Sequence, residues 1–200
     1  MNKKNQNFDY QLKIYILGFF GVGKSSVIER YVEDSFSEKD PYLISAETKS
    51  MKLIELDNKL VQLLLYECHF PTERFMFPYL NKNFDGVILV YDIYEYHCFE
   101  DIKRFITRYE FNNMVLILFG NKCDLGKNIE IEEQIKKLAD EYGIKHFEVS
   151  AKTGYNINEG FNSLINDIIA KRNLSGKTNT NNYELKKDVI INQKYNKCAQ

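Results

Sequence analysis

Short apolar runs alternate with amphipathic, helix-length segments along most of this chain of 200 residues. Runs of this kind, rich in β-branched and aromatic residues, are typical of buried strands, whereas apolar residues spaced three or four apart are typical of helices. The runs predict strands at 12–18, 53–56, 60–67, 86–93, 114–120 and 146–150. The amphipathic segments predict helices at 24–34, 98–110, 130–143 and 157–172.

This alternation indicates an α/β fold, in which a mostly parallel sheet is covered by helices on both faces. The two runs around the turn at residues 57–59 are expected to form a hairpin. In a parallel sheet, ligands bind in the loops at the carboxyl ends of the strands. We therefore expect functional residues directly after positions 17, 66, 92, 119 and 149.

Composition limits the class of protein. The chain is 44% hydrophobic with a net charge of −1, which gives no overall argument for nucleic-acid binding. It has no secretory signal pattern and no apolar run long enough to span a bilayer, so a cytoplasmic location is expected. The four cysteines lack zinc-site spacing and do not suggest a disulfide framework, which favours a reducing compartment. They are Cys68, Cys98, Cys123 and Cys198.

The predicted domain covers residues 10–172, between an N-terminal extension at 1–9 and a tail at 173–200. The tail is rich in asparagine and lacks periodicity, so we expect it to be flexible. Residues 171–200 carry seven basic and two acidic side chains, a net charge of +5. Basic segments favour anionic lipid surfaces. Peripheral contact with a membrane through the tail is therefore one expectation, and a solvated linker is the other.

The segment from Gly18 to Ser25 matches the pattern G-x-x-x-x-G-K-[ST] between a predicted strand and a predicted helix. Backbone N–H groups in such a loop surround phosphate oxygens, and the start of the helix favours the negative charge. Lys24 would bridge two phosphates, and the Ser25 hydroxyl would ligate Mg²⁺. The alternative, a chance glycine-rich turn, is disfavoured by the strand and helix on either side. The candidate phosphate-binding residues are Gly18, Gly21, Val22, Gly23, Lys24, Ser25 and Ser26.

Two further motifs follow predicted strands. In Asn121-Lys122-Cys123-Asp124, a carboxylate can accept bonds from guanine N1 and its exocyclic amine, which adenine does not offer. Asn121 could reach guanine N7 and tie this loop to the phosphate loop, while the Lys122 stem covers the ring. In Ser150-Ala151-Lys152, the Ala151 N–H could donate to guanine O6 and Lys152 could pack over the base. Either motif alone is more typical of a polar turn, but all three in this order favour guanine.

Together these motifs resemble those of the Ras-superfamily small GTPases, and residues 91–106 and 139–161 are most similar to the Rab branch. The resemblance implies a P-loop NTPase G domain with a six-stranded sheet and five helices. It also implies GTP/GDP binding with Mg²⁺, a role in vesicle and membrane traffic, and effector and regulatory partners that dock on the switch regions. It places Phe36 edge-on against guanine; the alternative for Phe36 is a core residue that closes the first helix.

The chain departs from the family around the γ-phosphate. Leu43 or Ile44 aligns with the switch I threonine, and Ser45 is the nearest hydroxyl for Mg²⁺. Switch II, at 66–75, lacks the family's glycine and water-orienting glutamine. Glu67 is the candidate to replace the family's Mg²⁺-associated aspartate, and Glu67 and His69 are weak candidates for a catalytic role.

Phe20 occupies a loop position that is usually Gly or Ser in the family, and its ring would fill space needed for in-line attack. We therefore expect guanine-nucleotide binding with slow or lost hydrolysis. The alternative is a cycling GTP hydrolase assisted by an activating protein. Cys198 lies third from the printed end, one residue short of a prenylation box, so lipidation and peripheral attachment to the cytosolic face of endomembranes stay open.

Overall fold

The computed structural model describes residues 8–37, 49–69, 84–95, 97–108, 114–126 and 128–174. Some of the expectations above concern other parts of the chain and lie outside the described residues. These are the switch I segment at 41–48 with Ser45, the switch II residues from 70 to 75, the side chain of His69, residues 1–7, and the tail from 175 with Cys198.

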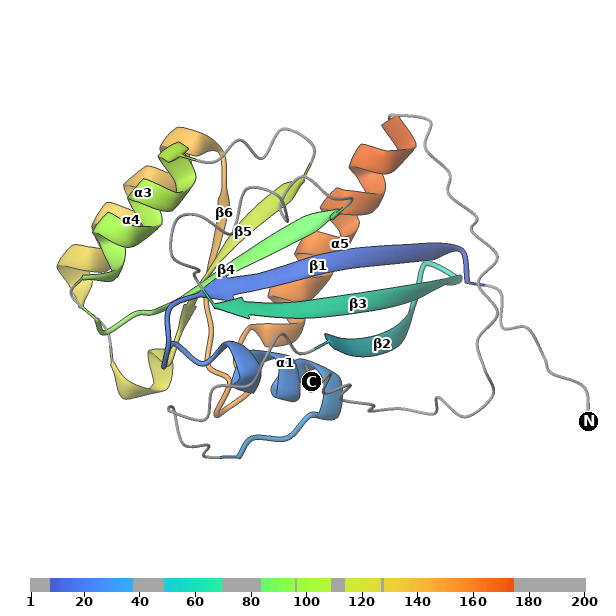
Figure 1. Ribbon diagram of the computed structural model, residues 1–200, viewed down its shortest axis with the longest axis horizontal. Coiled ribbons are helices and arrows are strands. Elements are labelled where there is room, and N and C mark those ends of the chain that lie inside the picture. The colour runs from blue at the N-terminus through green and yellow to red at the C-terminus, as the bar shows by residue number, and fades with distance from the viewer. Residues whose placement is uncertain are drawn as a thin grey trace, which may run out of the picture.

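A six-stranded sheet in the order β2-β3-β1-β4-β5-β6 forms the centre of the molecule (Figure 1). Five strands run parallel to one another: β3 (Lys59–His69), β1 (Tyr10–Gly18), β4 (Gly86–Asp92), β5 (Val115–Asn121) and β6 (Lys145–Glu148). This confirms the predicted α/β fold with a mostly parallel sheet. Because the strands share a direction, the loops after β1, β4, β5 and β6 emerge at one edge.

The predicted hairpin is also present. β2 (Lys49–Leu56) pairs antiparallel with β3 across a turn in which Asp57 and Asn58 have φ values of 49° and 59°. Both strands are longer than the predicted 53–56 and 60–67. The added residues at the start of β2 include Lys49, Ser50 and Lys52, which give no apolar signal but still complete the backbone ladder.

Helices cover both faces of the sheet (Figure 1). One face packs against α1 (Lys24–Glu33) and α5 (Ile157–Leu174), and the other packs against α3 (Cys98–Arg108) and α4 (Ile129–Tyr142). The fifth helix implied by the resemblance is not among the described residues. Within these ranges, no helix has the length and apolar content needed to cross a bilayer.

Strand β1 shows why the sheet needs helices on both faces. Ile14 and Ile16 belong to the core beneath α1 and α5, whereas Tyr15 and Leu17 belong to the core beneath α3 and α4. Successive side chains of a strand point to opposite faces, so a run apolar at every position is buried on both. This is the pattern that predicted the strand.

Some boundaries differ from the prediction. β6 ends at Glu148 rather than at residue 150. The Val149 N–H still donates to Gly120 of β5, but the Ser150 N–H turns to the carbonyl oxygen of Tyr155 in the following loop. α5 continues to Leu174, two residues into the predicted tail. A short 3-10 helix, η1 (Cys123–Leu125), was not predicted, because its three residues carry no periodic signal.

Candidate nucleotide-binding site

Asn121, the last residue of β5, joins the three motif loops. Its Nδ2 donates to the carbonyl oxygen of Val22 in the phosphate loop at 2.9 Å. Its Oδ1 accepts from the N–H of Ala151, in the loop after β6, at 3.0 Å. Only 2% of Asn121 is exposed, so leaving either of these hydrogen bonds unmade would destabilise the fold. The structure therefore brings together the motifs that the sequence placed far apart.

The phosphate loop needs glycine at its first and last glycine positions. A Cβ on Gly18 would lie 2.2 Å from the carbonyl oxygen of Val90 on β4. A Cβ on Gly23 would lie 2.3 Å from Asn121 Nδ2, and Gly23 also has a φ of 92°. At both positions a side chain would clash with neighbouring groups, and the positive φ would strain the backbone of any other residue.

Helix α1 begins immediately after this loop, with Gly23 as its N-cap and no side chain capping its first N–H groups. Its first turn holds no acidic residue, whereas the first turns of α3, α4 and α5 all contain one or two. Lys24 is 3% exposed, and its Nζ donates to the carbonyl oxygen of Phe19 at 2.7 Å. A helix start without acids, next to a buried ammonium group, is suited to an anion.

Ser25 and Glu67 form an oxygen pair beside this loop. Ser25 Oγ donates to Glu67 Oε1 at 2.6 Å, and Glu67 is only 5% exposed at the end of β3. Hydroxyl and carboxylate oxygens are the ligands that Mg²⁺ prefers, and Mg²⁺ usually completes its octahedral shell with water and phosphate. These two residues fit such a role. Among the described residues, no cluster of three or more His, Cys, Asp or Glu forms a metal site of its own.

The loop after β5 is held by ionic and hydrogen bonds. Lys122 has a φ of 68°, and its Nζ lies 2.7 Å from an oxygen of Asp92 at the end of β4. Asp124 is exposed, and its Oδ1 accepts a 2.6 Å hydrogen bond from Ser150 Oγ, which is fully buried. The carboxylate predicted to contact guanine is thus oriented by the loop after β6.

Ala151 and Phe36 differ from the simplest expectation. The Ala151 N–H, predicted to donate to guanine O6, donates in the structure to Asn121 Oδ1. Phe36 is half-buried and packs against the core beneath α1 and α5, which is the alternative considered for it. Contact of either residue with guanine stays a prediction.

The two phenylalanines of the phosphate loop are both exposed, Phe20 at 55% and Phe19 at 41%. The Phe20 ring centroid lies 5.9 Å from Lys24 Nζ. Both rings border a cavity of about 220 Å³ that reaches Cys98 on α3. Burial raises the pKa of the Cys98 thiol to about 12, with the nearby carboxylates of Glu95 and Asp92 adding to the effect, so this thiol stays protonated and unreactive.

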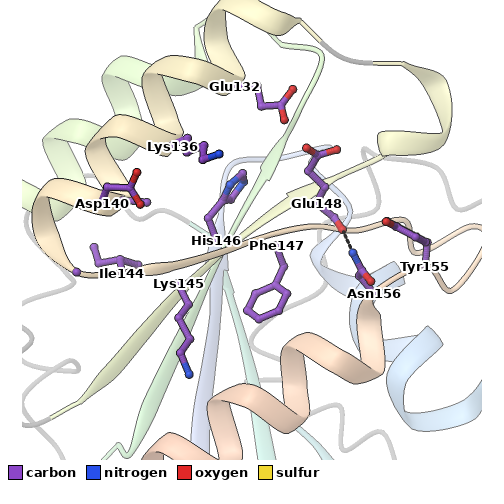
Figure 2. A pocket seen from close by; sticks show the side chains of 12 residues that line it. Glu132, Lys136, Asp140, Ile144, Lys145, His146, Phe147, Glu148, Tyr155 and Asn156 are labelled. Carbon is purple, nitrogen blue, oxygen red and sulfur yellow. Dashed lines mark hydrogen bonds between the residues drawn. The ribbon is translucent and has the colours of Figure 1, made fainter.

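A second cavity, of about 700 Å³, lies between α4 and β6 and is separate from the motif loops (Figure 2). His146 lines it, and its Nε2 lies 2.7 Å from the hydroxyl of Tyr91. Burial lowers the pKa of His146 and raises that of Tyr91. The contact therefore joins a protonated phenol and a neutral imidazole.

Sequence reasoning missed two residues of this site. Asp92 pairs with Lys122, and Arg30 on α1 bonds to backbone carbonyls of the loop after β6. Neither belongs to a spaced motif, so each is recognisable only once the fold places it. Glu67 was a sequence candidate because it lies near the end of its strand, at the position where the family has an acid.

The fold is a mostly parallel sheet covered by helices, with the phosphate loop after β1 and the NKxD and SAK motifs after β5 and β6. This combination defines a P-loop G domain. The model of the Ras family matches residues 13–170. The chain is 35% identical over 170 residues to Ras-related protein Rab-13 of Mesocricetus auratus, covering 82% of this chain and 83% of that protein. It is 34% identical over 174 residues to human Ras-related protein Rab-8B, covering 84% and 83%.

A third relative is GTP-binding protein ypt2 of Schizosaccharomyces pombe, which is 34% identical over 169 residues, covering 82% of this chain and 84% of that protein. The chain belongs to the Ras family and is a Rab-like small GTPase by sequence and fold. This confirms the resemblance seen in its motifs.

Proposed function

We propose that this protein binds GTP and GDP together with Mg²⁺ and acts in vesicle and membrane traffic, with slow or lost hydrolysis. The binding proposal rests on two hydrogen bonds of the Asn121 side chain. Its amide nitrogen donates to Val22 in the phosphate loop, and its amide oxygen accepts from Ala151 in the loop after β6. A nucleotide contacted by three separate loops requires that these loops be held at fixed positions relative to one another, and the Asn121 bonds do this.

The phosphates would lie against the backbone N–H groups of residues 21–26 at the start of α1, with Lys24 exchanging its bond to Phe19 for phosphate oxygens. Ser25 and Glu67 would hold Mg²⁺, and Mg²⁺ supplies neutralisation of the charge on the phosphate oxygens. Gly18 and Gly23 keep the loop close to its neighbours.

The guanine base would lie between the loops after β5 and β6. Asp124 would accept from N1–H and the exocyclic amine, held in orientation by Ser150. The stems of Lys122 and Lys152 would cover the ring, and Lys122 is already directed by Asp92. Adenine has no matching pair of donors, so this arrangement favours guanine.

Slow hydrolysis is supported by the sequence around the γ-phosphate and by the position of Phe20. Phosphoryl transfer depends on positioning the water and on stabilising charge, and the chain has no glutamine or glycine at the family's switch II positions. The Phe20 side chain is exposed beside Lys24, where the γ-phosphate would lie. Effectors and regulators would dock on the switch segments. Membrane contact would come through the basic tail.

The base assignment is tested by Asp124→Asn with Asp140→Asn, an exposed carboxylate on α4, as the matched control. Loss of charged hydrogen bonds should weaken GDP binding about 10- to 100-fold and shift preference toward xanthosine diphosphate, which presents an oxygen where guanine has an amine. Competition against a fluorescent nucleotide measures both. Unchanged GDP affinity in Asp124→Asn would remove the guanine assignment.

A further inference from the structure

We propose that Arg30 of α1 is a positioning residue for base recognition, which holds the loop 150–154 against the helix that starts at the phosphate loop. The inference rests on the proposed nucleotide binding and identifies a residue on which that site depends. Arg30 itself lies outside the three motifs and would touch neither base nor phosphate.

The guanidinium of Arg30 uses all three of its nitrogens. Nε donates to the carbonyl oxygen of Ala151 at 2.9 Å, and one terminal nitrogen donates to that of Lys152 at 2.8 Å. The other terminal nitrogen donates to the carbonyl and side-chain oxygens of Asp34, at 2.9 and 3.2 Å. The planar fork of arginine suits two consecutive carbonyls, which the compact ammonium group of lysine cannot match.

Ala151 is held from both sides. Its N–H donates to Asn121 Oδ1, and its carbonyl oxygen accepts from Arg30. Asn121 in turn donates to Val22 in the phosphate loop. Since α1 begins at Lys24, six residues and about 9 Å before Arg30, these bonds form a closed ring from the phosphate loop through the helix to the loop after β6.

The loop also folds around the arginine stem. A Cβ on Gly154, which has a φ of 84°, would lie 3.5 Å from Arg30 Cδ. The Gly154 N–H donates to the carbonyl oxygen of Ser150 at 2.8 Å, and Ser150 Oγ donates to Asp124. A shift of this loop away from Arg30 would therefore also disturb the carboxylate proposed to contact guanine.

A purely structural role for Arg30 predicts something different. The Asp34 carboxylate is 92% exposed, so that ion pair contributes little. A bond to the carbonyl oxygen of Asp34 at the end of α1 would support the helix without regard to the base. The two bonds to the loop are the ones that predict a selective loss of base binding, which leaves phosphate binding in place.

The test compares the wild-type chain with Arg30→Gln and Arg30→Lys, and with Arg104→Gln, an exposed arginine on α3, as the control. Affinities for GDP and for inorganic pyrophosphate are measured with Mg²⁺ by displacement of a fluorescent guanine nucleotide. Arg30→Gln should weaken GDP binding about tenfold or more, as expected for loss of a charge-assisted hydrogen bond. Pyrophosphate affinity should stay within about twofold of wild type, as should both affinities of Arg104→Gln.

Equal losses for GDP and pyrophosphate, or no loss of GDP affinity, would overturn the role of Arg30. If thermal melts show that Arg30→Gln is unfolded, Arg30→Lys takes its place, because it keeps the charge and the stem. The comparison is then between its loss of GDP affinity and its loss of pyrophosphate affinity. Failure of the proposed function gives a different result. In that case the wild-type chain would bind GDP no better than ADP, whereas a failed positioning role leaves wild-type GDP preference intact.

Discussion

Asn121 uses both ends of its side-chain amide to join loops, and Gly23 makes room for it. The Asn121 nitrogen that donates to Val22 would lie only 2.3 Å from a Cβ on Gly23, which is too close for two non-bonded atoms. Gly21 has a similarly positive φ, of 76°, but a Cβ there would meet nothing within 4 Å. The two glycines thus differ in crowding more than in backbone shape.

We expect Gly23→Ala to lower GDP affinity at least about tenfold more than Gly21→Ala, because only the first displaces the Asn121 amide and its hydrogen bond. The strain from a positive φ is common to both variants. Titration of each variant with a fluorescent GDP analogue measures the difference. Equal losses would show that backbone strain, rather than the Asn121 contact, sets the need for glycine.

The sequence predicted the motif residues because their chemistry depends on spacing that is visible in one dimension. The pairing of Lys122 with Asp92 and the bonds from Arg30 to Ala151 join residues about 30 and 120 positions apart. No periodicity marks such pairs. The engagement of the Ala151 N–H by Asn121 was missed for the same reason.

Helix α5 packs unusually close to strand β5 at Gly160. A Cβ there would lie 2.5 Å from two ring carbons of Phe119, which is fully buried. The same ring lies edge-on to Phe161 of α5. The glycine thus sets the distance between the helix and the sheet, even though glycine is a poor helix former.

Gly160→Ala should lower the free energy of unfolding by about 1–3 kcal/mol, since overpacking a dense core outweighs the better helix propensity of alanine. Asn162→Ala, at an exposed position of the same helix, is the control and should be neutral or slightly stabilising. Urea denaturation followed by circular dichroism gives both values. A stabilised Gly160→Ala would show that the helix moves outward without penalty.

Strands buried on both faces and helices with clear periodicity were predictable as elements, β1 and α4 among them. α4 ends at Gly143, which has a φ of 64°, as the sequence indicated. The start of β2 was not predictable, because its polar residues pair through their backbones. The end of β6 was not predictable because the Ser150 N–H turns to the following loop, and η1 was not because its three residues carry no periodic signal. Element type follows from side-chain patterns, whereas the limits of pairing depend on neighbouring strands.

At the level of the molecule, the two helical layers are supported by different cores, and one of them contains a titratable pair. His146 on β6 bonds to Tyr91 on β4 and faces Glu132, Lys136 and Asp140 of α4 (Figure 2). Burial lowers the pKa of His146, an effect that Lys136 adds to and that Glu132 and Asp140 oppose. The folded protein thus holds this ring neutral where the unfolded chain would protonate it.

Stability should therefore fall as the pH drops below about 6.5, the usual pKa of histidine, by at most about 1.4 kcal/mol per pH unit from this group. Above that pH the contribution is fully present, because the histidine is neutral in both states. Urea midpoints at pH 7.5 and 5.5 should differ more for wild type than for His146→Gln, which does not titrate. The same pH dependence of the urea midpoint in both proteins would show that a group other than His146 causes it.

This Rab-like small GTPase keeps the phosphate-loop, NKxD and SAK motifs joined through Asn121, while its sequence departs from the family around the expected γ-phosphate position. We propose that bound GTP is retained and hydrolysed slowly. The most direct measurement is single-turnover hydrolysis of GTP bound to the full chain, run beside human Rab-8B and a Phe20→Gly variant.

We predict that the wild-type rate is at least about tenfold below that of Rab-8B, because each lost positioning or charge-stabilising group is worth a factor of ten or more. Phe20→Gly should be faster than wild type, since it reopens the space for in-line attack. A wild-type rate equal to that of Rab-8B would contradict slow hydrolysis and support a cycling GTP hydrolase in its place.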